Sequence, residues 1–85
     1  MAGLPEPIVC AEFWRNRRGE SVRVQLREFE GQTLVDLRVH YLSGGKLMPT
    51  RKGLSIVVRR LPELAAAIGK ALDRAVELGL LEAKP

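Results

Sequence analysis

Two neighbouring segments alternate apolar and polar residues with a period of two, and this alternation limits the fold more than any other feature of the sequence. The segments cover residues 21–29 and 33–42, and their apolar members are Val22, Val24, Leu26, Val35, Leu37 and Val39. Because successive side chains of a strand point to opposite faces, the pattern predicts two half-buried strands. The short connection Glu30-Gly31-Gln32 predicts that they pair as an antiparallel hairpin.

Two further strands are expected, one on each side of this hairpin. The mainly apolar stretch Ile8–Trp14 predicts a first strand with a buried face. Ser43-Gly44-Gly45-Lys46 predicts a tight turn that leads into a fourth strand. Pro49 and Gly53 interrupt the ladder of that strand, so the segment that contains them is predicted to be bent or bulged.

The period changes at Leu61-Pro62, where a helix is expected to begin. Its sequence is rich in alanine and leucine, which favour helix to about Leu81. We expect a flexible leader at residues 1–7 and one domain at 8–85, with strands at about 8–60 and a helix at about 62–81. Four strands followed by one C-terminal helix predict an α+β fold.

The predicted helix has a wider apolar surface than one sheet needs. Its charged residues fall within an arc of about 100°, and apolar residues occupy much of the remainder. We therefore expect one side of the helix to lie on its own sheet and another side to pack on the same helix of a second chain, forming a homodimer. The expected dimer interface consists of Leu64, Ile68, Ala71, Leu72 and Ala75. The alternative is that alanine only supplies helix propensity.

The charge distribution permits a polyanionic partner. The chain of 85 residues has a formal net charge of +4, and eleven of its 14 basic residues lie in residues 1–60 together with six of its ten acids. The excess positive charge therefore belongs to the predicted strands. A solvated basic surface without a polyanionic partner is the alternative at this point.

The remaining composition favours a cytoplasmic protein. Cys10 is the only cysteine, so a disulfide framework within the chain is excluded and a reducing compartment fits best. The sequence has no apolar run long enough to span a bilayer and no signal peptide. We expect no membrane association.

Catalysis is not expected. His40 is the only histidine, and it lies on a different predicted strand from Cys10. The sequence contains no metal-ligand cluster, no Ser/His/Asp set and no phosphate-binding glycine motif. We therefore expect no catalytic residue, no metal and no cofactor.

Binding of single-stranded nucleic acid fits the residue types better. The polar sides of the central strands carry Arg23, Arg27 and Arg38, and Phe29 and Tyr41 lie at strand ends. Cations that follow the phosphates and aromatic rings that stack on bases are the means by which proteins hold single strands. Taken alone, this pattern is also compatible with ordinary exposed arginines and core aromatics.

Three segments in order resemble the transcriptional positive cofactor 4 family. They are Phe29-Glu30-Gly31 with Leu34-Val35-Asp36-Leu37-Arg38, then Pro49-Thr50-Arg51-Lys52-Gly53-Leu54-Ser55, then Leu61-Pro62-Glu63. The resemblance runs from about Val22 to Leu72, and the composition rich in Ala, Arg and Leu resembles that of prokaryotic members. It implies a four-stranded curved antiparallel sheet followed by one C-terminal helix. It further implies a homodimer, chiefly through the helix, that binds single-stranded DNA or melted duplex in its concave sheet surfaces.

The resemblance also assigns residues by position. Phe29 matches an aromatic beside the DNA, Arg38 a phosphate-contacting arginine, and Tyr41 a position where a stacking Trp is usual. Arg51 and Lys52 match a basic pair before the last strand. Glu30, Gln32 and Met48 stand where lysine is common, and the loop from Arg15 to Glu20 is longer than usual. The expected nucleic-acid-binding residues are Arg15, Arg17, Arg18, Arg23, Arg27, Phe29, Arg38, Tyr41, Arg51 and Lys52.

We therefore expect a sequence-tolerant, dimeric, single-stranded DNA-binding protein that acts in transcription, like a coactivator in contact with transcription machinery, or in repair or replication. In a prokaryote it is expected to be nucleoid-associated. One alternative is an RNA-binding module of the same shape, since backbone and stacking contacts do not select the sugar. Another is a protein-interaction module for an acidic partner.

Overall fold

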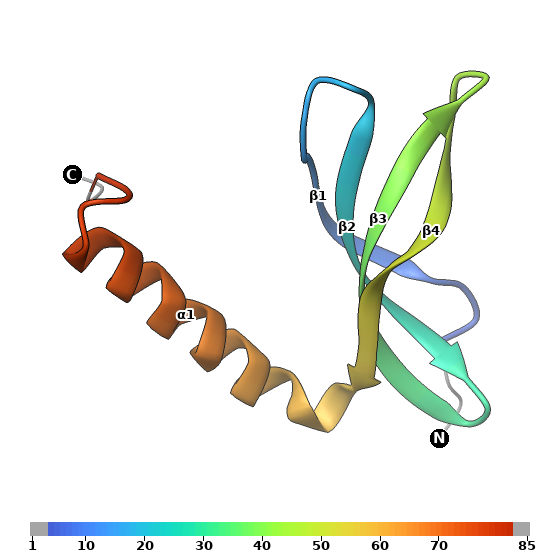
Figure 1. Cartoon of the computed structure of the whole chain (residues 1–85). Coiled ribbons are helices and arrows are strands. Elements are labelled where there is room, and N and C mark those ends of the chain that lie inside the picture. Colours follow the sequence, from blue (N-terminus) through green and yellow to red (C-terminus); the bar gives the residue numbers. More distant parts are fainter. Residues whose placement is uncertain (1–3, 83–85) are drawn as a thin grey trace.

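The computed structural model describes residues 4–82 and forms one antiparallel sheet with one long helix (Figure 1). The elements are β1 (Ile8–Trp14), β2 (Glu20–Phe29), β3 (Gln32–Ser43), β4 (Lys46–Val57), a 3₁₀ turn η1 (Val58–Arg60) and α1 (Leu61–Glu77). The strands lie in the order β1-β2-β3-β4. The α+β fold with a curved four-stranded antiparallel sheet is confirmed. Of the expected leader, residues 1–3 lie outside the described residues, and Leu4–Pro7 forms neither strand nor helix.

Two-residue turns set the register of the central strands. Phe29 pairs with Gln32 around Glu30 and Gly31, and Ser43 pairs with Lys46 around Gly44 and Gly45. The central residues have positive φ, at 49° and 79° in the first turn and 59° and 80° in the second. These are the signs of a type I′ turn, whose twist matches that of paired strands.

The register gives the sheet two chemically different faces. Residues directly opposite one another share a face, and side chains alternate along each strand. The apolar face carries Ile8, Phe13, Val22, Val24, Leu26, Val35, Leu37, Val39, Tyr41, Leu54 and Ile56. The polar face carries Glu12, Trp14, Ser21, Arg23, Gln25, Arg27, Phe29, Asp36, Arg38, His40 and Ser55.

A bulge in β4 confirms the bend predicted there. Arg38 pairs with Gly53 and His40 pairs with Pro49, so residues 50–52 of β4 stand against a single residue of β3. Gly53 has a φ of 154°, and a Cβ there would collide with the carbonyl oxygen of Leu37. The bulge therefore depends on glycine at this position.

The helix ends at Glu77, before the expected end near Leu81. Gly79 takes a φ of 74°, its N–H donates to the carbonyl of Val76 at 3.0 Å, and the Leu80 N–H donates to the carbonyl of Ala75 at 2.9 Å. These two bonds form a Schellman motif, which satisfies the last helical carbonyls and stops the helix.

The expectation that α1 lies on its own sheet is wrong for the single chain. The helix projects away from the strands (Figure 1) and makes no extensive contact with any of them in the described region. Its predicted interface residues Leu64 and Ala75 are half-buried, and Ile68, Ala71 and Leu72 are exposed. The expected buried face of β1 is also wrong, because every residue of that strand is exposed. Among the described residues, Val35 is the only buried apolar side chain.

Candidate nucleic-acid interface

The centre of the polar face is held by an ion pair between neighbouring positions of β3. Asp36 is fully buried, and its Oδ1 accepts a bond from Arg38 Nη2 at 2.9 Å. The Ser55 hydroxyl on β4 donates to the same oxygen at 2.6 Å, and Arg38 Nη1 donates to the Thr50 carbonyl at 3.0 Å. Arg38 therefore joins β3 to the β4 bulge, and most of its donors are already in use.

The pKa values of this pair move apart. Burial by itself raises the pKa of Asp36, but the hydrogen bonds from Arg38 and Ser55 hold it below its usual value. The hydrogen bond to Asp36 raises the pKa of Arg38. Both groups are thus charged at neutral pH, and each largely cancels the field of the other.

Arg23 is also paired. It lies opposite Arg38 across β2 and β3, as the alternation predicts. Its Nε donates to Glu12 Oε2 on β1 at 2.6 Å. Of the three arginines predicted on this face, only Arg27 has no acidic partner within the described residues. The sequence showed the face of each arginine but not its partner, because the pairing depends on cross-strand register.

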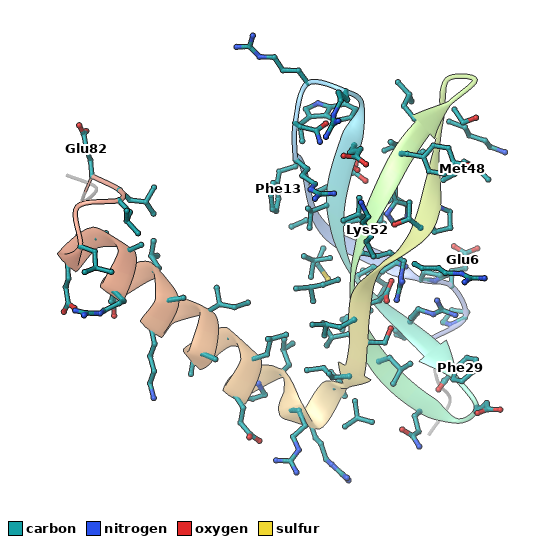
Figure 2. The ribbon with its side chains drawn as sticks, viewed as in Figure 1. Glu6, Phe13, Phe29, Met48, Lys52 and Glu82 are labelled. Carbon is teal, nitrogen blue, oxygen red and sulfur yellow. The ribbon has the colours of Figure 1, made fainter. Side chains whose placement is uncertain are left out.

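The β4 bulge presents the predicted basic pair Arg51 and Lys52. Thr50 Oγ1 donates to the Val39 carbonyl at 2.7 Å and accepts from the Lys52 N–H at 3.1 Å. The backbone of the bulge is therefore fixed by Thr50 and Arg38 rather than by its own cations. Arg51 and Lys52 remain exposed, and Figure 2 shows where Lys52 projects from β4.

The β1–β2 loop is also fixed by backbone and amide contacts. Asn16 Oδ1 accepts from the Arg18 N–H at 2.9 Å, as in an Asx turn. The Gly19 carbonyl accepts from the Leu42 N–H at 2.9 Å, which attaches the loop to the end of β3. Arg17 and Arg18 point into solvent with no acidic partner in the described part of the chain. We call the end of the sheet that is formed by the β1–β2 loop (residues 15–19) and the neighbouring Gly44-Gly45 turn the loop end.

The Glu20 carboxylate lies near cations from the β1–β2 loop and from β4. Asn16 Nδ2 donates to Glu20 Oε1 at 2.6 Å, and this bond, followed by the charges of Arg15, Lys52 and Arg18, lowers the pKa of Glu20 despite some desolvation. Arg15 Nη1 lies 3.5 Å from the same oxygen. Three of the predicted binding residues (Arg15, Arg17 and Arg18) thus belong to the loop end, and the charge of Lys52 reaches it from the β4 bulge.

The two predicted aromatics lie at opposite ends of the sheet. Phe29 is 51% exposed beside the Glu30-Gly31 turn, with the Arg27 guanidinium carbon 6.0 Å from its ring centre. Tyr41 lies opposite Glu20 and Met48 on the apolar face. Figure 2 shows Phe29 and Met48 at the two ends of the sheet. The nine residue-to-residue steps from Gln32 to Tyr41 along β3, at about 3.3 Å each, span ~30 Å. A bound nucleic-acid strand that touches both Arg38 and Tyr41 therefore has to pass from one face of the sheet to the other.

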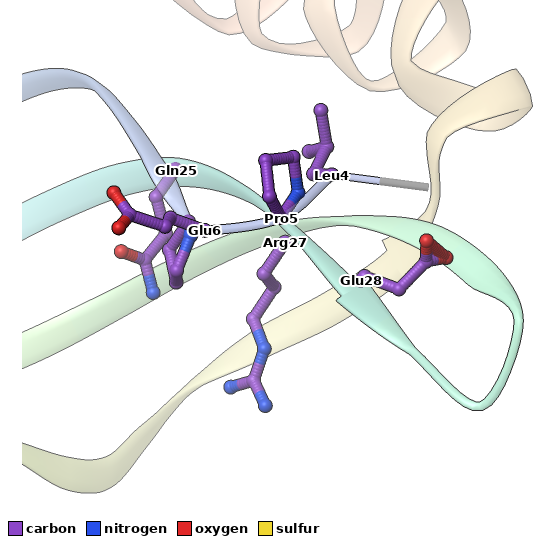
Figure 3. A pocket seen from close by; sticks show the side chains of 7 residues that line it. Leu4, Pro5, Glu6, Gln25, Arg27 and Glu28 are labelled. Atoms are coloured by element: carbon purple, nitrogen blue, oxygen red, sulfur yellow. The ribbon is translucent and has the colours of Figure 1, made fainter. Parts of the chain in front are cut away.

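A shallow hollow of about 260 Å³ lies at the Phe29 end (Figure 3). The segment Leu4–Pro7 forms one side, and Gln25, Arg27 and Glu28 form the other. Glu6 and Glu28 both line it, so Arg27 lies among carboxylates that form no ion pair with it. This end is therefore less positive than the loop end.

Trp14 is the exposed aromatic that sequence reasoning missed. It lies in the stretch predicted as a strand with a buried face, and it is 61% exposed on the polar face, opposite Ser21. The available signal was its position as the only tryptophan, directly before the basic loop Arg15–Arg18.

The described residues contain neither a metal-ligand cluster nor a helix suited to cross a membrane. No group of three or more His, Cys, Asp or Glu side chains in residues 4–82 is placed to hold a metal ion. No helix in that range combines the length and the apolar character that a bilayer crossing needs.

Comparison with known proteins gives a consistent result. Residues 16–67 match the family Transcriptional Coactivator p15 (PC4). The chain is 42% identical over 74 residues to the RNA polymerase II transcriptional coactivator KELP of Arabidopsis thaliana, covering 79% of this chain and 41% of that protein. It spans less than half the length of the curated relatives it matches.

Two solved structures share the fold. The PC4 homolog BPSL1147 of Burkholderia pseudomallei superposes with a TM-score of 0.70 at 22% identity, covering 82% of this chain and 95% of that chain. MoSub1, solved as a complex with single-stranded DNA, superposes with a TM-score of 0.60 at 18% identity, covering 91% of this chain and 92% of that chain.

Proposed function

This chain belongs to the transcriptional coactivator p15 (PC4) family, and on that premise we propose that it is a coactivator-like protein that binds single-stranded DNA. The single observation that carries the proposal is where the unpaired cations lie. Within the described structure, the cations on the strands and their connecting loops that have no acidic partner are Arg17, Arg18, Arg27, Lys46, Arg51 and Lys52. All six lie within the segment that matches the family.

The proposed mechanism assigns different tasks to paired and unpaired cations. Arg23 links β2 to β1 through Glu12, and Arg38, paired with Asp36, links β3 to the β4 bulge. The unpaired cations attract phosphates and release their counterions, which supplies affinity without sequence preference. Exposed rings such as Phe29 stack on bases, and every base offers a π-face. We propose that the protein acts by binding alone, without catalysis.

We also propose that the functional unit is a homodimer. The radius of gyration is 15.2 Å, whereas a compact chain of this length has about 12 Å. Large apolar side chains are exposed on both the apolar sheet face and the helix, among them Phe13, Leu54, Ile68 and Leu72. A second copy covers both surfaces at once, as a small domain with so little core needs.

The binding proposal is tested by titrating labelled single-stranded DNA, duplex DNA and RNA at two salt concentrations. We expect single-stranded DNA to bind most tightly, with a log–log salt slope of about −0.7 for each phosphate contact. Absent or salt-insensitive binding of single-stranded DNA contradicts the proposal. Tighter binding of RNA would assign the interface to RNA instead.

The dimer proposal is tested by light scattering across a range of protein concentrations. We expect twice the mass of the chain, and Leu72→Glu is expected to shift the equilibrium towards monomer because it places a charge in the predicted interface. The exposed helix residue Lys70 provides the control, since Lys70→Glu lies outside the predicted interface. A folded wild-type monomer at all concentrations contradicts the proposal.

A further inference from the structure

A small hollow lies beside Trp14 on the polar face. Its volume is about 120 Å³, and Glu12, Phe13, Trp14, Ser21 and Leu47 line it. Trp14 belongs to β1 and Leu47 to β4, the two outer strands of the sheet. Residues of both outer strands line one hollow only if the sheet curls towards its polar side there. The curl therefore makes the polar face concave at the loop end.

Ser21 lines this hollow, and its hydroxyl has no hydrogen-bond partner among the described residues. The residue is 1% exposed, and its Oγ is the only buried side-chain polar atom in residues 4–82 that makes no hydrogen bond. A buried hydroxyl without a partner costs free energy, so a hydrogen-bonding group that reaches Ser21 Oγ from the hollow stabilises the protein. The volume is several times what a single water needs, so the hollow admits waters or a flat ring in their place.

The walls of the hollow suit a flat aromatic ligand. Trp14 offers the ring of largest area among natural side chains, and Leu47 adds apolar surface to the same hollow. Glu12 also lines the hollow, but its carboxylate is bound by Arg23 at 2.6 Å, so its charge is largely compensated. A ring that enters the hollow contacts the side chains that line it, among them Trp14, Leu47 and Ser21.

A cationic hollow adjoins the same tryptophan. It has a volume of about 420 Å³ and is lined by Trp14, Asn16, Arg17 and Gly19. Arg17 is exposed and has no acidic partner among the described residues. The indole thus lies between a pocket for a ring and a cation for a phosphate, which are the two parts of a nucleotide.

We propose that the hollow beside Trp14 takes one unpaired base of the bound single strand, stacked on the indole with its edge hydrogen-bonded to Ser21 and the adjoining phosphate at Arg17. This inference rests on the proposed binding of single-stranded DNA and adds a base site to it. The Ser21 hydroxyl both donates and accepts, so it accommodates the edge of any base. The site therefore contributes affinity without imposing a sequence.

The tryptophan itself reports on the site. Because Trp14 is the only tryptophan, the indole emission of the protein comes from one residue. Labelled oligothymidine is titrated against the full chain, with oligonucleotide anisotropy and Trp14 emission followed together. We expect quenching that saturates at the same concentration as the anisotropy, because base stacking quenches the ring in direct contact.

Three variants test the contacts. Trp14→Ala is expected to weaken binding by about 5- to 150-fold, the range for one stacked base, whereas Trp14→Phe retains most of the affinity. Ser21→Ala is expected to weaken binding by about 2- to 10-fold while the melting temperature of the free protein stays equal or rises, since an unpaired hydroxyl is removed. A merely structural serine predicts a fall in melting temperature. Ser43→Ala, at an exposed serine of the loop end, is the matched control.

The outcomes separate this inference from the proposed function. Normal oligonucleotide binding with unchanged emission, and with unchanged affinity in Trp14→Ala and Ser21→Ala, overturns the base site and leaves single-strand binding intact. No anisotropy change in the wild type overturns the proposed function itself. If Trp14→Ala does not fold, the wild-type emission and Ser21→Ala still decide. If Trp14 emission changes on dilution of the protein but not on addition of DNA, the hollow belongs to a contact between copies of the chain. That result also overturns the inference.

Discussion

The centre of the polar face and the loop end use their cations differently. In the centre, Arg38 and Arg23 are bound by Asp36 and Glu12. At the loop end, Arg17 and Arg18 point into solvent, and the backbone there is fixed by Asn16 and by the contact of Gly19 with β3. The comparison shows that an arginine on a polar strand face can serve the fold, whereas Arg17 and Arg18 on a fixed loop remain available for a ligand.

The largest expected effect comes from breaking the central pair. Asp36→Ala leaves the half-buried Arg38 without its partner, and we expect the free energy of unfolding to fall by about 3–5 kcal/mol, as for other broken buried pairs. The measurement is urea unfolding at fixed protein concentration, since association also affects stability. Glu12→Ala removes the acid of the more exposed pair and is expected to cost less than about 1 kcal/mol. Equal losses in the two variants would remove the distinction between the pairs.

The next effect concerns binding and acts at the loop end. The double variant Arg17→Ala/Arg18→Ala is expected to reduce the log–log salt slope for single-stranded DNA by about 1.4, two phosphate contacts at 0.7 each. The control is Arg59→Ala/Lys70→Ala, which makes the same change in charge outside the sheet. If both double variants reduce the slope equally, binding depends on net charge and not on the loop end.

The smallest effect is expected from acid, which protonates the Asp36 carboxylate of the central pair and leaves its side chain in place. Because the pKa of Asp36 is lowered in the folded protein, the unfolded chain binds its proton at a higher pH. The stability from this group is therefore fully present above about pH 4, the usual Asp pKa, and is lost as the pH falls through the folded pKa. Urea midpoints between pH 7 and pH 3 measure this loss. Asp36→Asn is expected to flatten the curve, and an unchanged curve contradicts the assignment.

The sequence predicted those parts of the fold that depend on local pattern. The alternation in residues 21–29 and 33–42 fixed the faces of β2 and β3, and Pro49 with Gly53 indicated the β4 bulge. The end of the helix was missed because its alanine and leucine pattern continues past Glu77, although Gly79 carried the signal. The open position of α1 was not predictable, since apolar width shows that a surface needs cover but not what covers it.

The candidate site was predicted by residue type more than by arrangement. The loop cations and the pair Arg51-Lys52 are exposed as expected. The use of Arg23 and Arg38 as internal partners depends on which acids the register brings beside them. The availability of Trp14 depends on the curl of the sheet. Neither the register nor the curl of the sheet is determined by any single segment of the sequence.

The β4 bulge has a second consequence, which concerns solubility. β4 lies at an edge of the sheet, where free backbone groups invite another strand to pair and so begin aggregation. Pro49 offers no N–H, the bulge breaks the straight ladder, and Arg51 and Lys52 add charge to the same stretch. Proline, bulges and charged side chains are the features by which natural proteins prevent an edge strand from pairing with another sheet. The segment with which this chain is proposed to attract DNA thus also keeps neighbouring sheets from joining it edge to edge.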